Sequence, residues 1–195
     1  MRLAVANGEE SDLELLEQVR RGEPSGAARL FERYGTPLLR FTDRMLGSRP
    51  DAEEITQEVF LKMITRVEQY DGQAPVASWL FAIAANACRD RLRRGRRAHP
   101  VSLEVITERP DGSEPADARL LQKEKRLAVR RALGSLSQEQ REALILARYH
   151  GMPYAEIART LAISEGAVKT RIFRAMEALK LRFAQGDASW NAATH

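Results

Sequence analysis

The chain has 195 residues, of which 44% are apolar and 30% are charged, and its formal net charge is +4 at pH 7. This length and apolar content allow one large or two small packed domains without a membrane span. The charge is unevenly distributed, because Arg89 to Arg97 is strongly basic and Asp51 to Glu58 is acidic. We therefore expect one surface that attracts phosphate and another that attracts a basic partner.

Several function classes are disfavoured by the residues that the chain lacks. The one cysteine, Cys88, leaves no internal disulfide to form, and the three histidines stand at no metal-ligand spacing. The segment MRLAVANGEESD has too short an apolar run for a signal peptide or anchor. No P-loop or catalytic triad is present. We expect a cytoplasmic non-enzyme with no catalytic residues, metal or cofactor, no membrane insertion and no small-molecule substrate.

The first half of the chain predicts helices with recognisable ends. Ser11 and Glu14 form a capping box before a short helix that stops near Gly22. A second helix is expected from Pro24 to Gly47, with Pro37 marking a kink or a restart.

A third helix is expected to open at Pro50, with carboxylates in its first turn at the positive end of the helix dipole. Ile55, Val59 and Met63 recur every fourth residue and predict its buried stripe. An adjacent stripe mixes charge with an exposed leucine and indicates a protein partner, because a merely solvated face would not need the leucine. This stripe consists of Glu54, Gln57, Glu58 and Leu61.

A turn-rich loop, Tyr70 to Pro75, precedes a fourth helix that Ser78 is expected to cap and Gly95 to end. The first half of this helix is core-like, and burial is the simpler explanation of Trp79 and Phe81. Its second half is rich in arginine with little acid to offset it, which predicts contacts with nucleic acid phosphates.

The segment HPVSLEVITERPDGSEPADA, residues 99–118, has no sustained periodicity and collects proline, glycine, serine and acids. It predicts a domain boundary. We expect an all-α chain of two small helical domains, at 1–97 and 119–183, joined by a flexible linker at 98–118. A loose tail is expected at 184–195.

The stretch from Pro153 to Lys180 predicts two short helices joined by a tight turn, with cations on the second. Ser164 is placed to cap that second helix, which begins at Glu165. A preceding helix starts with a capping box of Ser137 and Gln140. This pattern is typical of a helix-turn-helix DNA reader. A basic amphipathic helix within an all-helical core is the plainer alternative.

Taken together, the segments resemble an extracytoplasmic-function (ECF) sigma factor, a minimal bacterial RNA polymerase sigma subunit of the sigma-70 family. DAEEITQEVFLKM, residues 51–63, resembles the helix of region 2 that binds core polymerase. SWLFAIAANACRDRLRR, residues 78–94, resembles the promoter-melting helix, and residues 136–179 resemble region 4. The chain departs from the family at Ala162, where a glycine is frequent in the turn.

The resemblance implies three sets of site residues and three partners: core RNA polymerase, promoter DNA and an anti-sigma factor. Docking on the coiled coil of the large polymerase subunit is expected for Asp51, Glu54, Gln57, Glu58 and Leu61. Binding of the melted minus-10 strand is expected for Tyr70, Asp71, Gly72, Gln73, Trp79, Asn86, Arg89 and Arg93. Reading of the minus-35 duplex is expected for Ser164, Lys169, Thr170, Arg171, Phe173 and Arg174, with Arg171 on phosphate.

The implied function is promoter-specific transcription initiation without covalent chemistry. A dimeric helix-turn-helix repressor or activator is the alternative, but it leaves the acidic third helix and the arginine run unexplained. A metal-dependent nuclease using Asp51, Glu54 and Glu58 is disfavoured, because the helix dipole already accounts for acids at a helix start.

Overall fold

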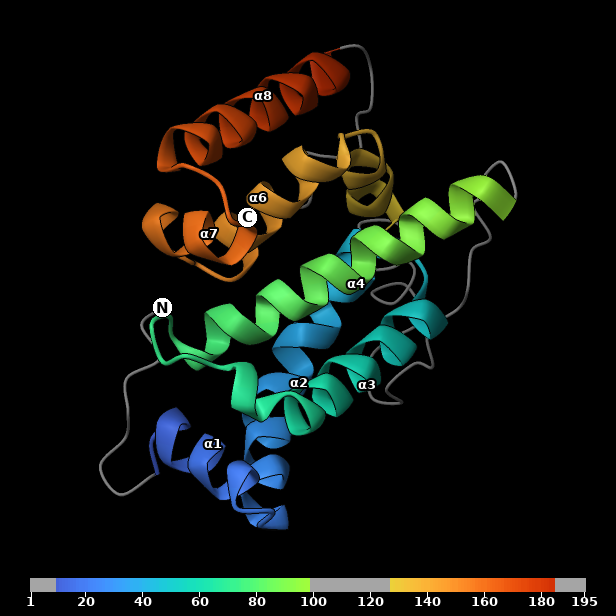
Figure 1. The fold of residues 1–195 in the computed structure, drawn as a ribbon. Helices are drawn as coiled ribbons and strands as arrows, with labels where there is room; N and C mark the ends of the chain where they lie inside the picture. Colours follow the sequence, from blue (N-terminus) through green and yellow to red (C-terminus); the bar gives the residue numbers. More distant parts are fainter. Residues whose placement is uncertain (1–9, 99–126, 185–195) are drawn as a thin grey trace, which may run out of the picture.

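The computed structural model describes residues 10–98 and 127–184 (Figure 1). The described residues form helices joined by turns, with no strand among them, which confirms the predicted all-α fold. The first group of helices is α1 (Asp12–Arg20), α2 (Pro24–Leu46), α3 (Arg49–Thr65), the short 3₁₀ helix η1 (Val67–Gln69) and α4 (Val76–Ala98). The second group is a helix at residues 127–134, then α6 (Gln138–Tyr149), α7 (Tyr154–Leu161) and α8 (Glu165–Ala184).

Local capping explains where α1 begins and where α2 ends. The Ser11 hydroxyl accepts from the Glu14 amide at 3.3 Å, and the Glu14 carboxylate accepts from the Ser11 amide at 2.6 Å. The chain leaves α2 through Gly47, whose φ of 70° is a left-handed conformation that suits glycine. Pro37 lies inside α2, which continues through it, so of the two expected possibilities, a kink or a restart, the restart is absent.

The bounds of α4 differ from the prediction at both ends. The helix begins at Val76, so Ser78 is inside it and does not cap it. The Ser78 hydroxyl instead donates to Glu156 of α7 at 2.5 Å. Gly95 does not end the helix, which runs to Ala98. A glycine inside a helix costs only about 1 kcal/mol, so neighbouring arginines with high helix propensity can carry the helix through it.

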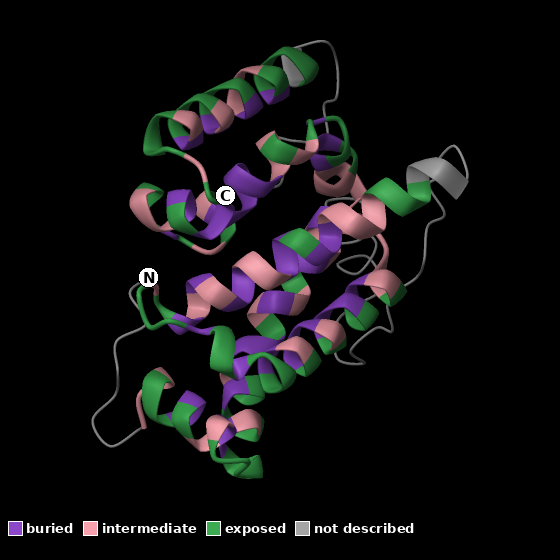
Figure 2. Ribbon diagram, viewed as in Figure 1, coloured by how far each residue is buried: buried purple, intermediate pink, exposed green. Residues whose placement is uncertain are grey.

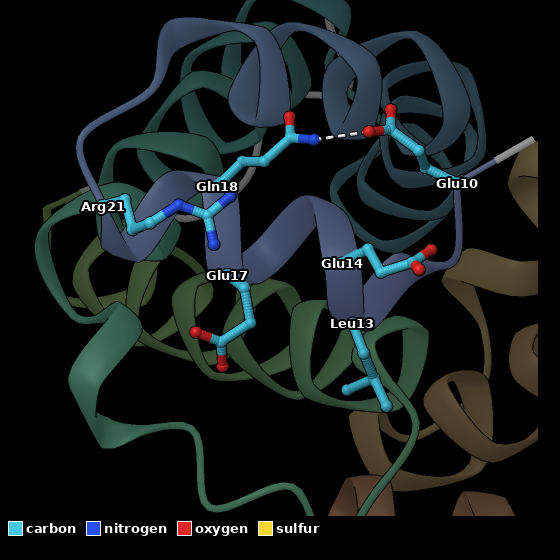
Figure 3. A pocket seen from close by; sticks show the side chains of 6 residues that line it. All are labelled: Glu10, Leu13, Glu14, Glu17, Gln18 and Arg21. Carbon is cyan, nitrogen blue, oxygen red and sulfur yellow. Dashed lines mark hydrogen bonds between the residues drawn. The ribbon is translucent and has the colours of Figure 1, made fainter.

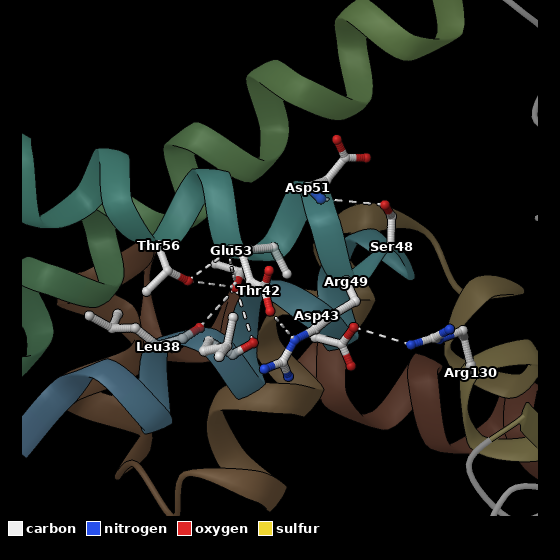
Figure 4. Close-up of polar contacts among 11 residues, drawn as sticks. Leu38, Thr42, Asp43, Ser48, Arg49, Asp51, Glu53, Thr56 and Arg130 are labelled. Atoms are coloured by element: carbon white, nitrogen blue, oxygen red, sulfur yellow. Dashed lines mark hydrogen bonds and ion pairs between the residues drawn. The ribbon is translucent and has the colours of Figure 1, made fainter. Parts of the chain in front are cut away.

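Buried residues lie on the inner sides of the helices (Figure 2). Ile55, Val59 and Met63 of α3 are all at most 2% exposed, which confirms the predicted buried stripe. A polar contact joins α2 to α3 within this core (Figure 4). The Thr42 and Thr56 hydroxyls lie 3.1 Å apart, and the Thr56 hydroxyl donates to the Ala52 carbonyl at 2.7 Å. These buried hydroxyls are therefore satisfied.

The turn between α7 and α8 forms as expected although it lacks glycine. Ala162 adopts the left-handed conformation, with φ of 53°, at a cost of roughly 1 to 2 kcal/mol. The Ser164 hydroxyl then accepts from the Ala167 amide at 3.1 Å, and α8 begins at Glu165. The two helices are packed together by four buried residues, Ile157, Leu161, Val168 and Ile172, and by the half-buried Ile163.

Helix α4 crosses the middle of the molecule, with α1 to α3 on one side and α6 to α8 on the other (Figure 1). It packs against α7, and α2 packs against α6, so the two groups of helices contact each other. Most of the predicted linker and nearly all of the predicted tail lie outside the described residues. Among the helices that the structure describes, none is both long and apolar enough to cross a membrane.

Candidate nucleic-acid interface

The first turns of α8 carry the residues expected to read duplex DNA. Lys169, Thr170, Phe173 and Arg174 are all exposed, and Phe173 is 66% exposed. The opposite side of α8 is held in the core by Val168 and by residues of the following turns. A large exposed aromatic ring among cations is unusual on a solvated helix, and it suits contact with base edges and thymine methyl groups.

Two other residues of the minus-35 set have structural positions. The hydroxyl of Ser164 is engaged as the cap of α8, so its oxygen supports the helix start. Arg171 is half-buried, which agrees with a contact at the edge of the reading surface and not at its centre. The predicted minus-35 residues are thus brought together at one end of one helix.

Three of the predicted minus-10 residues lie on successive turns of α4. Asn86 and Arg93 are exposed, and Arg89 lies between them. The Arg89 guanidinium donates to the Asn86 side chain at 2.9 Å, and Arg93 pairs with Asp90 at 2.6 Å. Because a helix rises about 1.5 Å per residue, this row covers roughly 10 Å of α4.

Arg89 is also held by a carboxylate from the other group of helices. It donates to the two Glu142 oxygens of α6 at 2.8 and 2.7 Å, and this bidentate pair raises the pKa of Arg89. The Glu142 side chain is fully buried. Sequence reasoning missed Glu142, although it lies three and four residues before the buried Ile145 and Leu146 and so belongs to the buried stripe of α6.

The loop between η1 and α4 has a buried base and an exposed tip. Tyr70 is only 8% exposed, its ring packs against Trp79 with centroids 5.2 Å apart, and its hydroxyl donates to the Ala74 carbonyl at 2.5 Å. At the tip, the Asp71 carboxylate accepts from the Gln73 amide at 3.0 Å. Asp71, Gly72 and Gln73 are exposed, so the tip is open to a ligand and the two aromatic rings hold its base.

Three of the predicted polymerase-binding residues of α3 are exposed, Glu54, Gln57 and Leu61, whereas Asp51 and Glu58 are half-buried. Arg91 of α4 contacts Asp51 at 2.7 Å and Glu54 at 2.5 Å, and this ion pair lowers the pKa of Glu54. Leu61 is 62% exposed. Ile64, which sequence reasoning missed, is 48% exposed one turn further on and extends the apolar part of the surface. The i, i+3 spacing from Leu61 is the signal that could have identified it.

The remaining residues of this stripe complete a mixed surface. Gln57 is exposed, and Glu58 pairs with Lys62 of the same helix at 2.6 Å. Carboxylates, an amide and two apolar side chains therefore share one side of α3.

A shallow hollow on α1 does not have the character of a nucleic-acid site (Figure 3). It is lined by Glu10, Leu13, Glu14, Glu17, Gln18 and Arg21. Glu10 accepts a hydrogen bond from Gln18 at 2.5 Å, and three of these side chains are carboxylates that repel phosphate. Within residues 10–98 and 127–184, no group of three or more His, Cys, Asp and Glu side chains is placed to hold a metal ion.

Comparison with known families assigns both groups of helices. The family model described as Sigma-70 region 2 matches residues 30–98, and the model described as Sigma-70, region 4 matches residues 126–179. The ECF RNA polymerase sigma factor SigM of Mycobacterium tuberculosis is 36% identical over 168 residues, which cover 86% of this chain and 82% of SigM. The chain belongs to the ECF sigma factors of the sigma-70 family.

Two solved structures share the fold of this ECF sigma factor. CnrH, in complex with the cytosolic domain of CnrY, is 25% identical with a TM-score of 0.70 over 91% of this chain and 100% of CnrH. RpoE of Bartonella quintana, in complex with the anti-sigma factor NepR, is 24% identical with a TM-score of 0.63 over 82% of this chain and 97% of RpoE. The second likeness concerns the fold alone.

The family assignment confirms the predicted class of function. This ECF sigma factor acts with RNA polymerase in promoter-specific transcription. A dimeric repressor would not account for the region 2 match. The structure also gives no support to the nuclease alternative, because the Asp51 and Glu54 carboxylates that would bind the metal ion are paired with Arg91.

Proposed function

We propose that this ECF sigma factor binds core RNA polymerase through α3, holds the melted minus-10 strand along α4 and reads the minus-35 duplex with the first turns of α8. The observation that carries the proposal is the exposure of Lys169, Thr170, Phe173 and Arg174 at the start of a helix whose other side is buried. A helix presented in this way fits the major groove of B-form DNA.

Arg174 is the proposed base-reading residue of α8. It is exposed and lies four residues after Thr170, so its guanidinium shares the side of the helix that carries Thr170. Arginine binds the edge of guanine through two parallel hydrogen bonds, which contribute roughly 1 to 3 kcal/mol of discrimination. Arg171, half-buried beside this surface, serves as a phosphate contact.

The minus-10 strand is proposed to lie along Asn86, Arg89 and Arg93, whose row is long enough for more than one backbone phosphate. The exposed tip at Asp71, Gly72 and Gln73 captures a base that has left the stack. Tyr70 and Trp79 support the tip from below, because their rings pack on each other. Direct contact of Tyr70 or Trp79 with a base stays a prediction.

Two protein partners, core RNA polymerase and an anti-sigma factor, are proposed from the surface of α3 and from the membership of the ECF sigma factors. Core polymerase docks on the mixed stripe of α3, where Gln57 and Leu61 are free and the carboxylates suit a basic helical partner. We also propose an anti-sigma factor as a partner, since RpoE, which shares the fold, was solved with one.

The test is transcription with core polymerase and the full chain on a template library randomised across the promoter, with the transcripts sequenced. Arg174→Ala should flatten the preference at one base pair of the minus-35 element. Lys180→Ala is the matched control, because Lys180 is an exposed cation near the other end of α8. An even loss of activity across all templates would show that Arg174 contacts only phosphate and that base reading belongs to its neighbours.

A further inference from the structure

The two groups of helices meet at a charged contact that includes a proposed DNA-binding residue. Arg89 of α4 binds Glu142 of α6 through two hydrogen bonds of 2.8 and 2.7 Å. The Arg89 side chain is 33% exposed, whereas the Glu142 side chain is fully buried. One guanidinium is thus occupied by a carboxylate that comes from region 4.

Further contacts at the same junction hold region 4 in this position. Ser78 of α4 donates to Glu156 of α7 at 2.5 Å. Arg130 contacts Asp43 of α2 at 3.1 Å (Figure 4). Arg141 of α6 donates to the carbonyl of Met45 at 2.6 Å. These contacts are polar, and water can replace them when the surfaces separate. The ring of His150, which packs against Phe81 and Phe41, adds an apolar contact to the same junction.

Glu142 makes the packing of α6 against α4 depend on which anion the Arg89 guanidinium binds. A buried carboxylate that loses its cationic partner is strongly unfavourable. If another anion takes the Arg89 guanidinium, Glu142 must become solvated, and this requires α6 to move away from α4. Carboxylates and phosphates bind arginine in the same bidentate geometry, so a DNA phosphate and Glu142 are direct competitors.

We propose that the packing in this structure is a closed, autoinhibited state in which Glu142 of region 4 occupies the Arg89 guanidinium that the melted DNA strand requires. This inference rests on the role proposed above for Arg89. The minus-35 surface of α8 stays exposed in the same packing. The closed state therefore blocks single-strand binding and leaves duplex binding free.

The test compares two probes on the full chain without polymerase: a short fluorescein-labelled single strand of mixed sequence and the duplex of that sequence. Glu142→Gln keeps the size of the side chain but removes its charge. We expect the single strand to bind roughly ten-fold more tightly or better, because a larger fraction of the protein is open, and the duplex affinity to stay within about two-fold. Small-angle X-ray scattering should show a larger radius of gyration for the variant.

Glu177→Gln is the matched control, because it removes one carboxylate from region 4 on α8, where Glu177 pairs with Lys180 and not with region 2. It should leave both probes and the scattering unchanged. Glu156→Ala removes the acceptor of the bond from Ser78, which is a different contact of the junction, and should act in the same direction as Glu142→Gln. If Glu142→Gln does not fold, the same two measurements on this second variant test the proposal.

The outcomes separate this inference from the proposed function. If folded Glu142→Gln and Glu156→Ala bind the single strand no better than the unmodified chain and have the same radius of gyration, the closed state is refuted. If the variants open but Arg89→Ala in the Glu142→Gln background does not weaken single-strand binding, the assignment of Arg89 fails, and the competition proposed for Glu142 fails with it. Tighter strand binding that depends on Arg89, together with expansion, supports both.

Discussion

The stability of the packing between the two groups of helices should fall in mild acid because of His150. The His150 ring packs against Phe81 with centroids 4.7 Å apart and against Phe41 at 6.1 Å. Burial, together with the nearby cations Arg44 and Arg40, lowers its pKa to about 4 from an ordinary value of 6.5. Protonation is therefore resisted in the folded protein and free in the unfolded chain.

The sign and size follow from proton linkage. The unfolded chain takes up a proton on His150 as the pH falls through 6.5, whereas the folded protein does so only near pH 4. The stability that the neutral ring provides is complete above pH 6.5 and is lost progressively down to pH 4. Between pH 7 and pH 5 the loss is about 2 kcal/mol in the free energy of unfolding.

The variant His150→Phe keeps an aromatic ring between the two phenylalanines and cannot be protonated. The Nε2 atom of His150 is buried without a hydrogen-bond partner, so its removal leaves no polar group unsatisfied. Urea unfolding at pH 7 and pH 5 should show the pH-dependent loss in the unmodified chain and a loss smaller by about 2 kcal/mol in the variant. Equal losses in both proteins would refute the reasoning and transfer the pH dependence to the carboxylates.

Three further outcomes are expected. Glu54→Lys combined with Glu58→Lys should abolish binding to core polymerase without loss of the helical circular dichroism signal. The control variant Glu53→Lys, at an exposed residue on another side of α3, should bind core polymerase normally. Retained binding by the double variant would exclude this surface as the polymerase-binding site. Arg93→Ala should weaken single-strand binding on all sequences alike and reduce the slope of log affinity against log salt by about one unit, and a sequence-dependent loss would contradict a phosphate contact. Thr42→Val should lower the free energy of unfolding in urea by only about 1 kcal/mol, since Thr56 keeps its bond to a carbonyl, and a much larger loss would show that the two hydroxyls act as a unit.

The features that could be predicted from the sequence are those decided by neighbours along the chain. The capping boxes at Ser11 and Ser137 and the cap at Ser164 each depend on residues within one turn, and each forms as expected. The buried stripe of α3 follows from helical periodicity in the same way. The residues of the minus-35 set lie together because they belong to one helix start.

The features that could not be predicted depend on residues distant in sequence. Ser78 has the chemistry of a cap, yet it lies inside α4 and binds Glu156, 78 residues away. Glu142 lies 53 residues from Arg89, and no local pattern pairs the two. The exposure of Glu54 was foreseen, but its pairing with Arg91 was not, because helical periodicity assigns a residue to a face without saying which helix lies beside that face.

The bridge from Arg91 to Asp51 and Glu54 has a mechanical consequence. It ties the start of α3 to the second half of α4, and both helices also pack on α2. A protein that binds α3 therefore binds a unit that includes α4. The distance from the proposed docking surface on α3 to the proposed strand-binding row on α4 is therefore held by these ion pairs and by the packing of both helices on α2. Docking alone would then align the arginine row with the opened duplex, and the orientation of the strand would need no separate adjustment.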